Sequence, residues 1–282
     1  MMTHADQHEL LFVKWGGSLI TEKSAPFTLN YGAVTRLVKE LKDALEADAQ
    51  LQVLIGHGGG SFPHPVAQSY RTGEGFIQDT SVRGFALCQN AASTLNRLIV
   101  DLMTDYAINA VSIQPSACCI TTNGTIVEFF TQPLEAALEH GLVPVIFGDC
   151  VFDTARGCAI VSTEQLFLHL SALLQPARVL ILSLVNGVYT ADPHKDTSAR
   201  IIPEIELEQL ADIEGYLSGS YAVDVTGGMA SKVKELVRIA KCGIECEIMS
   251  GAPGNLKRAL AGQRGIGTCI NPVQRRGRIE KL

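Results

Sequence analysis

The amino-acid sequence predicts an α/β fold with a largely parallel sheet. Short continuous apolar runs alternate with longer segments of helical periodicity along most of the 282 residues, which is the pattern of βαβ units. Glycine-rich turns directly follow two of the apolar runs, and open α/β sheets bind ligands at turns beyond the carboxyl ends of their strands. The same observations therefore predict both the fold and the edge of the sheet that carries the site.

The apolar runs have the length and continuity of buried parallel strands. We expect strands at Leu10–Val13, Leu51–Ile55, Ala110–Ile113, Val143–Phe147, Val179–Leu184 and Cys246–Met249. Apolar residues at helical spacing predict helices at Asn30–Glu46, Arg83–Tyr106 and Ser231–Lys241. No repeat or clear linker divides the chain, and we place a lobe boundary near Leu174–Arg178, which gives lobes at residues 1–175 and 176–282.

Composition limits the class of protein. With 46% hydrophobic and 18% charged residues, the chain resembles a compact enzyme rather than a disordered protein. No apolar run approaches the ~18 residues that a membrane-spanning helix needs, and Met1–Glu9 lacks a signal-peptide pattern. The net charge of −6 disfavours nucleic acid, although a few lysines in a cleft still attract an anion. We therefore expect a cytoplasmic protein that acts on a small molecule, without a membrane or nucleic-acid partner.

The eight cysteines are scattered and form no C-x2-C pair. Most lie in apolar stretches, where a free thiol packs as a small hydrophobe. We expect neither a zinc site nor a disulfide framework, and no metal ligands among the site residues.

The glycine-rich turns carry the first indication of chemistry. They are Lys14–Ser18, His57–Ser61 and Thr226–Met229. Glycine lets the backbone approach an anion closely, so that free N–H groups can donate to it. Steric needs explain one such turn, but three favour phosphate binding. Walker, Rossmann and protein-kinase motifs are absent from the sequence, which predicts phosphoryl transfer on a different scaffold.

Lysines next to these turns supply positive charge. Lys14 ends the first strand, where a phosphate contact explains a buried ammonium better than a snorkelling side chain does. Lys232 stands in the first turn of a helix, where the dipole disfavours a cation unless an anion is bound. For Lys23, the residues alone favour a solvated surface position.

Two histidines flank the second turn. His64 lies beyond it and can donate a hydrogen bond to an acceptor phosphate, whereas His57 continues the strand and is expected to pack. Asp149, which follows Gly148 at a strand end, fits two roles equally: a turn-former, or an organiser of the lysines and a metal.

These residues lie in longer segments that resemble the amino-acid-kinase superfamily and, within it, the isopentenyl phosphate kinases. The segments, in family order, are Lys14–Thr21 with Lys23, His57–Ala67, Ala110–Ser116, Pro144–Asp149, Tyr216–Ser220, and Asp224–Met229 with Lys232. The glycine motifs indicate only the superfamily. His64, the stretch at Ser112–Ser116 and the last two segments indicate this branch.

The resemblance implies an open αβα sandwich with an N-terminal substrate lobe and a C-terminal nucleotide lobe, usually as a homodimer. It implies transfer of the ATP γ-phosphate to isopentenyl phosphate with Mg²⁺. By position, the ATP contacts fall on Lys14, Trp15, Gly16, Gly17, Ser18, Ser61, Gly228 and Lys232. The acceptor contacts fall on Gly60, His64 and Gly148. Lys23 takes the place of the transition-state stabiliser, beside Lys14 and His64 as the catalytic residues, and this replaces the surface interpretation of Lys23.

The chain departs from the family pattern at three places. Leu184 and Asn186 stand where the family often has two acids, and Glu164 lies in a stretch that replaces Ser-Gly-Asp-Asp. Both changes predict altered nucleotide contacts. Pro63 replaces a glycine before His64 and stiffens that loop.

Two other functions fit parts of the sequence. A fosfomycin-kinase-like enzyme would have a smaller, more polar acceptor site, whereas a prenyl tail needs an apolar pocket, which we expect near Phe76, Phe85 and Leu95. A non-catalytic nucleotide-binding regulator would explain the lost acids but not the retained lysines and His64. Acetylglutamate and uridylate kinases are less favoured, because their sites need groups for a carboxylate or a base.

Overall fold

The computed structural model describes residues 9–193, 195–207 and 228–272. Its main sheet has eight strands in the order β12-β14-β13-β9-β1-β2-β6-β3. Their bounds are β1 Leu10–Trp15, β2 Gln52–His57, β3 Ala110–Ser112, β6 Val143–Phe147, β9 Arg178–Ser183, β12 Glu204–Ile205, β13 Glu245–Ser250 and β14 Thr268–Ile270. The six strands from β3 to β13 are parallel, and β14 is antiparallel to β13. The predicted α/β fold with a mainly parallel sheet is confirmed.

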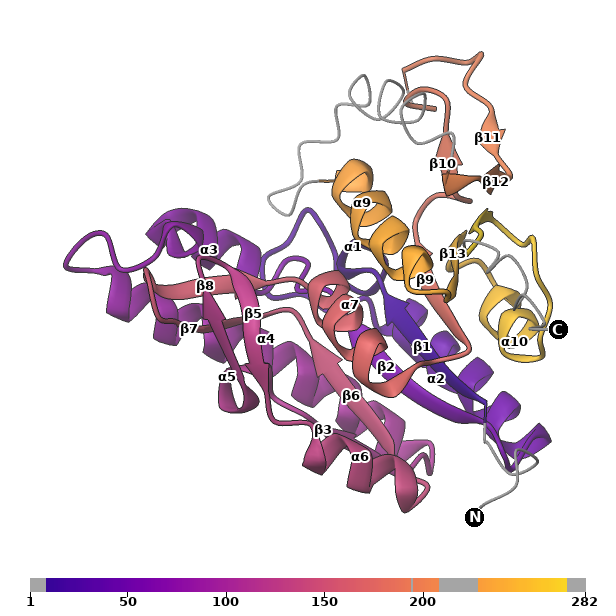
Figure 1. Cartoon of the computed structure of the whole chain (residues 1–282), viewed down its shortest axis with the longest axis horizontal. Helices are drawn as coiled ribbons and strands as arrows, with labels where there is room; N and C mark the ends of the chain where they lie inside the picture. The colour runs from indigo at the N-terminus through magenta and orange to yellow at the C-terminus, as the bar shows by residue number, and fades with distance from the viewer. Residues whose placement is uncertain (1–8, 194, 208–227, 273–282) are drawn as a thin grey trace, which may run out of the picture.

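Helices cover both faces of this sheet (Figure 1). One hydrophobic core packs α2 (Tyr31–Ala47), α4 (Ser81–Asp105) and α10 (Asn255–Leu260) against one face. A second core packs α6 (Gln132–Glu139), α7 (Thr163–Leu174) and α9 (Gly228–Lys241) against the other. Side chains alternate along β1, so that Trp15 belongs to the first core and Phe12 to the second. The layers are those of an αβα sandwich.

A second, four-stranded sheet lies beside the first and was not predicted. It has the order β5-β4-β7-β8, with bounds β4 Cys119–Thr122, β5 Thr125–Phe129, β7 Asp149–Asp153 and β8 Gly157–Val161. Asp153 ties its turns together, because its buried carboxylate accepts hydrogen bonds from the backbone N–H groups of Asn123, Gly124, Ala155 and Arg156. Burial alone would raise the pKa of Asp153, but the hydrogen bonds from Gly124, Thr121, Arg156 and Ala155 outweigh it and hold the pKa well below its ordinary value.

Short elements complete the described chain. They are α1 Gly17–Ile20, α3 Pro63–Tyr70, α5 Pro115–Cys118, the 3-10 helix Thr72–Glu74, and the strands β10 Val188–Tyr189 and β11 Ile201–Ile202. Among the helices of the described chain, none combines the length and the apolar character that a membrane span requires. The segments Tyr216–Ser220 and Asp224–Gly227, which carry part of the family resemblance, lie outside the described residues.

The helices begin where local chemistry favours them. Asn30 caps α2, and its side chain accepts a hydrogen bond from Ala33 N at 3.0 Å. Ser162 caps α7 in a reciprocal capping box with Gln165. Strand β9, beyond the proposed lobe boundary, pairs with β1, so one sheet runs through both lobes. The division at residue 175 stays a prediction.

Candidate active site

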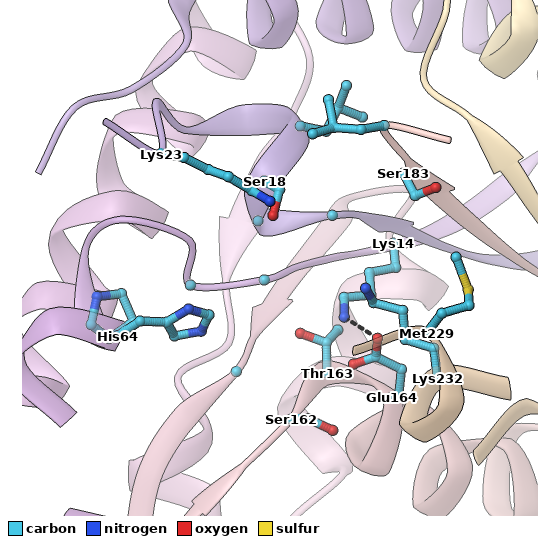
Figure 2. A pocket seen from close by; sticks show the side chains of 18 of the residues that line it. Lys14, Ser18, Lys23, His64, Ser162, Thr163, Glu164, Ser183, Met229 and Lys232 are labelled. Carbon is cyan, nitrogen blue, oxygen red and sulfur yellow. Dashed lines mark ion pairs between the residues drawn. The ribbon is translucent and has the colours of Figure 1, made fainter. Parts of the chain in front are cut away.

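A pocket opens at the carboxyl ends of the parallel strands, where the sequence places the site. It is bounded by the ends of β1, β6 and β9, the loop after β2, and the first turns of α1, α3, α7 and α9 (Figure 2). Eight of the predicted site residues line it: Lys14, Gly16, Gly17, Ser18, Lys23, His64, Gly148 and Lys232. Residues from the first 65 positions and from position 232 therefore meet in one cavity.

The first two glycine-rich loops pack directly against each other. A Cβ at Gly17 would lie 2.5 Å from Gly60 N, and one at Gly58 would lie 2.7 Å from Gly17 N. Gly60 has a φ of 53°, and a Cβ there would meet Thr21 Oγ1 at 2.1 Å. The glycines are thus required for the contact between the loops, and the contact makes the two loops one continuous surface.

The remaining predicted contacts lie around this surface. The side chain of Trp15 is fully buried in the core, while its carbonyl accepts from Gly58 N at 3.0 Å. Ser61 donates its hydroxyl to Thr28 O at 3.4 Å, and its N–H to Thr21 Oγ1 at 3.0 Å. Trp15, Gly60 and Ser61 are not among the described residues that line the pocket, and the lining is not described at Gly228. The geometry of Trp15 and Ser61 is that of residues that hold the loops.

A buried ion pair joins the end of β1 to the first turn of α7. The ammonium of Lys14 contacts the carboxylate of Glu164, and both residues are 5% exposed (Figure 2). Burial alone would raise the pKa of Glu164, but the charge and hydrogen bond of Lys14, with the charge of Lys232, hold it below its ordinary value. Glu164 is therefore an anion between two lysines that line the pocket.

Glu164 is a site residue that the sequence motifs do not predict. Two signals were present. The stretch Ser162–Gln165 has the pattern of a capping box, and it follows an apolar run. Together they place an acid in the first turn of a helix at the edge where Lys14 ends.

Lys23 is exposed, as its surface interpretation requires, and it also lines the pocket. It follows α1, and its side chain extends toward Ser18 in Figure 2. The side chain of Lys23 is thus both open to solvent and part of the cavity wall. The chain geometry is thus compatible with the role that the resemblance implies.

His64, in the first turn of α3, stands beside an apolar part of the cavity. Small or branched side chains line this part: Pro63, Ala67, Cys88, Ala92, Cys150 and Ile160. Cys88 and Ala92 come from α4, one turn apart. The ring nitrogen Nε2 of His64 lies 3.5 Å from the position that a Cβ of Gly59 would take, so His64 and the second glycine loop are adjacent.

The three apolar residues that were predicted to form the pocket for the prenyl tail lie elsewhere in the structure. Leu95 is fully buried in the core beneath the sheet. Phe76 and Phe85 pack edge to face, with centroids 6.0 Å apart, and Phe85 also packs on Phe152 at 4.8 Å. None of these three predicted residues lines the pocket within the described chain. Cys88 and Ala92 of α4 line it instead, because helical periodicity shows which face of a helix is buried but not which turn faces the cavity.

His57 packs at the end of β2, as predicted. It is 1% exposed, and its ring stacks on Phe147 with centroids 5.4 Å apart. Burial lowers the pKa of His57 to about 4; the hydrogen bond to Gly58 opposes this shift and the charge of Lys14 adds to it. His57 is therefore neutral near pH 7.

Asp149 lines the pocket, but backbone N–H groups of α5 and β7 already donate hydrogen bonds to its carboxylate. Its carboxylate accepts from Ser116 N at 3.0 Å and from Cys150 N at 2.8 Å. Burial raises its pKa to about 6 in spite of these hydrogen bonds. These hydrogen bonds tie the start of β7 to α5 and involve neither a lysine nor a turn, so both roles that the sequence left open stay predictions.

The remaining wall, at the end of β9, is the side that the resemblance assigns to nucleotide. Its lining residues are Ser183, Leu184, Val185, Gly187, Tyr189, Ala191, Asp192, Pro193 and Met229. Leu184 is 58% exposed, so an apolar side chain faces solvent where the family often has an acid. Asn186 is not among the described residues that line this wall.

Comparisons with known proteins show the family to which the chain belongs. The model of the amino acid kinase family matches residues 9–250. An isopentenyl phosphate kinase of Methanothermobacter thermautotrophicus is 38% identical, over 93% of this chain and 98% of that protein. An isopentenyl phosphate kinase of Methanocaldococcus jannaschii is 34% identical, over 83% of this chain and 88% of that protein.

Solved structures give the same result. One isopentenyl phosphate kinase structure superposes with a TM-score of 0.79 at 34% identity, covering 93% of this chain and all of the other. The carbamate kinase of Giardia lamblia, at 15% identity and a TM-score of 0.69 over 95% of this chain and 99% of the other, shows the shared fold alone. The chain belongs to the amino acid kinase family and, within it, to the isopentenyl phosphate kinases.

Proposed function

We propose that this protein transfers the γ-phosphate of ATP to isopentenyl phosphate, giving isopentenyl diphosphate and ADP. The observation that carries the proposal is the division of one pocket into two parts. Lysines and glycine backbone surround the first part, and His64 beside a small apolar chamber forms the second. An alkyl monophosphate has the same two parts, a charged head and an apolar tail.

The polar part fits the needs of phosphoryl transfer. Charge accumulates on the transferring phosphoryl group, so catalysis consists mainly of positioning and positive charge. Lys14 and Lys232 line the wall shared with α7 and α9, and Lys23 reaches the pocket from the opposite loop. We assign Lys14 and Lys232 to the ATP phosphates and Lys23 to the group in transfer. The N–H groups of Gly17 and Ser18 complete the ATP side.

Magnesium would be held chiefly by the ATP phosphates. Within the described residues, no group of three or more His, Cys, Asp or Glu side chains could hold a metal ion. This agrees with a Mg²⁺ ion that enters with the nucleotide, since Mg²⁺ keeps several waters and is often bound through substrate phosphates. In that form the ion would neutralise part of the negative charge of the nucleotide.

The acceptor would occupy the other part. His64 and the backbone of Gly59 would donate to its phosphate, with Gly148 on the facing wall. The five-carbon tail would lie among Ala67, Cys88 and Ala92. Its burial supplies affinity of ~0.8 kcal/mol for each methylene-sized group.

The alternatives differ in what the apolar chamber is for. Fosfomycin is compact and polar, and the chamber lined by Cys88, Ala92 and Ile160 would offer it no hydrogen bonds. A non-catalytic regulator would not need the acceptor side.

We also propose that the protein is cytoplasmic and forms a homodimer. Strand β3 leaves a free edge on the main sheet in the described chain, and a second copy could cover it.

The test is an ADP-release assay with Mg²⁺-ATP and a panel of acceptors. We expect turnover with isopentenyl phosphate and dimethylallyl phosphate, and little with fosfomycin, acetylglutamate or uridylate. Turnover with fosfomycin alone would replace the proposed substrate. ATP binding without ADP release for any acceptor would support the regulator.

A further inference from the structure

The imidazole of His57 lies directly beneath the second glycine loop, outside the pocket lining. Its Nδ1 is 3.1 Å from the carbonyl oxygen of Gly58, and its Nε2 is 3.2 Å from Asn96 Nδ2. Asn96, in α4, is 2% exposed, and it is also hydrogen-bonded to Ser112 at the edge strand β3. Four residues from β2, its following loop, α4 and β3 thus form one chain of hydrogen bonds, which is buried at His57 and Asn96 and reaches the surface at Ser112.

The direction of every hydrogen bond in this chain follows from one group. A carbonyl oxygen only accepts, so His57 Nδ1 must carry a proton and donate to Gly58 O. Because His57 is neutral, its Nε2 is then an acceptor, and Asn96 must present its NH₂ group to it. The Asn96 carbonyl is left to accept from the hydroxyl of Ser112. The network has a single consistent orientation and fixes His57 as the Nδ1–H tautomer.

This orientation determines where the next amide points. The C=O of Gly58 and the N–H of Gly59 belong to one planar trans peptide and point in opposite directions. With the Gly58 carbonyl held toward the buried ring, the Gly59 N–H is turned away from it, and Gly59 lines the pocket. In the described chain, no hydrogen bond uses the Gly59 N–H. The network therefore presents an unused donor to the cavity next to His64.

The backbone of His57 fixes two more walls of the same cavity. Its carbonyl oxygen accepts from Thr163 Oγ1 at 2.7 Å and from Gly148 N at 3.2 Å. Thr163 precedes Glu164 in the first turn of α7, and Gly148 lies on the acceptor side. One residue outside the pocket is thus bonded to three segments that line it.

We propose that His57, held as the Nδ1–H tautomer by Asn96 and Ser112, is a positioning residue that aims the Gly59 amide at the phosphate of the acceptor. The inference rests on the proposed function, because it takes that phosphate to be bound beside His64. His57 does not touch the acceptor. It acts through the peptide between Gly58 and Gly59, and its loss should weaken acceptor binding while ATP binding is kept.

The variant His57→Phe tests this. Phenylalanine retains a ring to stack on Phe147 but removes both nitrogens. We expect KM for isopentenyl phosphate to rise about tenfold, as for loss of one hydrogen bond to a charged group, with KM for ATP changed less than about twofold. The matched control is His169→Phe in α7, where a half-buried histidine packs near Phe129 away from the pocket. It should leave both constants unchanged.

Equal changes in both KM values, or no change in either, would overturn the proposal. If His57→Phe does not fold, Asn96→Leu should give a smaller rise in the same constant, because the tautomer is then no longer fixed. The unaltered protein provides an independent measurement: ¹⁵N NMR of its imidazoles at pH 7 should show His57 protonated at Nδ1, and protonation at Nε2 would contradict the network. If the unaltered protein does not phosphorylate isopentenyl phosphate, the proposed function fails, and the NMR result still decides the orientation of the network.

Discussion

The ammonium of Lys14 and the carboxylate of Glu164 form an ion pair that is almost fully buried, at the junction of β1 and α7. In a buried ion pair each residue compensates the charge of the other, so removal of one residue leaves an uncompensated charge in the interior. Lys14 can therefore point into the pocket at a fixed position because Glu164 is there. Lys232 adds a second positive charge near the same carboxylate.

We predict that Glu164→Gln lowers kcat/KM for ATP by at least about tenfold, because Gln keeps the shape but not the charge that orients the two lysines. Steady-state ADP release measures this. Glu46→Gln is the matched control, since Glu46 pairs with Lys42 on the exposed side of α2. A Glu164→Gln enzyme with unchanged kinetics would show that the lysines are positioned without the pair.

Lys23→Ala should lower kcat by roughly 100-fold or more and leave both KM values within about threefold, as expected for a charge that acts on the transition state. Single-turnover transfer from labelled ATP separates the chemical step from product release. Lys42→Ala, which removes a lysine of α2 distant from the pocket lining, should have no effect. Full turnover by Lys23→Ala would remove Lys23 from the mechanism.

His64→Ala should raise KM for isopentenyl phosphate by about tenfold with a smaller effect on ATP, because a donor to the acceptor phosphate is lost. His64→Gln retains an N–H donor and should recover part of the affinity. His140→Ala, on the turn after α6, is the control. A larger rise in KM for ATP than for isopentenyl phosphate would mean that His64 binds the phosphates of ATP and not that of the acceptor.

The apolar chamber makes a prediction of its own. Ala92→Phe fills space between α4 and the pocket, and should raise KM for isopentenyl phosphate by about tenfold or more while KM for ATP is retained. A small acceptor such as methyl phosphate distinguishes tail from head, because its weak use should be unaffected. Equal losses for both acceptors would mean that the tail lies elsewhere.

The pKa of His57 predicts how stability depends on pH. The folded pKa of about 4 lies below the ordinary value of 6.5, so the unfolded chain binds more protons between these pH values. The contribution of His57 to stability is therefore complete above pH 6.5 and is lost as the pH falls toward 4. His57→Phe lacks this term, and its deficit relative to the unaltered protein should shrink by about 2 kcal/mol from pH 7 to pH 5.

Urea unfolding of both proteins at pH 7, 6 and 5 measures this difference. The comparison with the variant is needed because Asp149 acts in the opposite direction. Burial raises its pKa from 3.8 to about 6, so its contribution falls as the pH rises through that range. Since Asp149 is present in both proteins, its effect cancels. A deficit that stays constant over this range would show that His57 is not buried as a neutral group.

Much of the fold could be read from the sequence because its signals are local. The run Leu10–Val13 is apolar on both faces, as a central parallel strand must be, and Asn30 caps the helix that follows. The strands of the second sheet escaped prediction because they are short and mix polar with apolar residues, as in Cys119–Thr122. Their stability comes from tertiary contacts such as those of Asp153.

The site was predictable where motif and strand end coincide. Lys14, the two glycine turns and His64 were found in this way, and all of them meet at the pocket except for the residues that hold the loops from behind. Glu164 and the apolar residues Cys88 and Ala92 were missed. A buried acid and an exposed acid look alike in a sequence. Helical periodicity shows which face of a helix is buried, but not whether that face packs on the core or lines a cavity.

The most direct test of the central claim is the identity of the product. The protein is incubated with Mg²⁺, ATP labelled at the γ-phosphate and isopentenyl phosphate, and the products are separated and identified by mass spectrometry and ³¹P NMR. We predict that the label appears in isopentenyl diphosphate in equal amount to the ADP formed, and that Lys23→Ala loses most of this transfer. Label released only as inorganic phosphate, or no transfer with active nucleotide binding, would contradict the account.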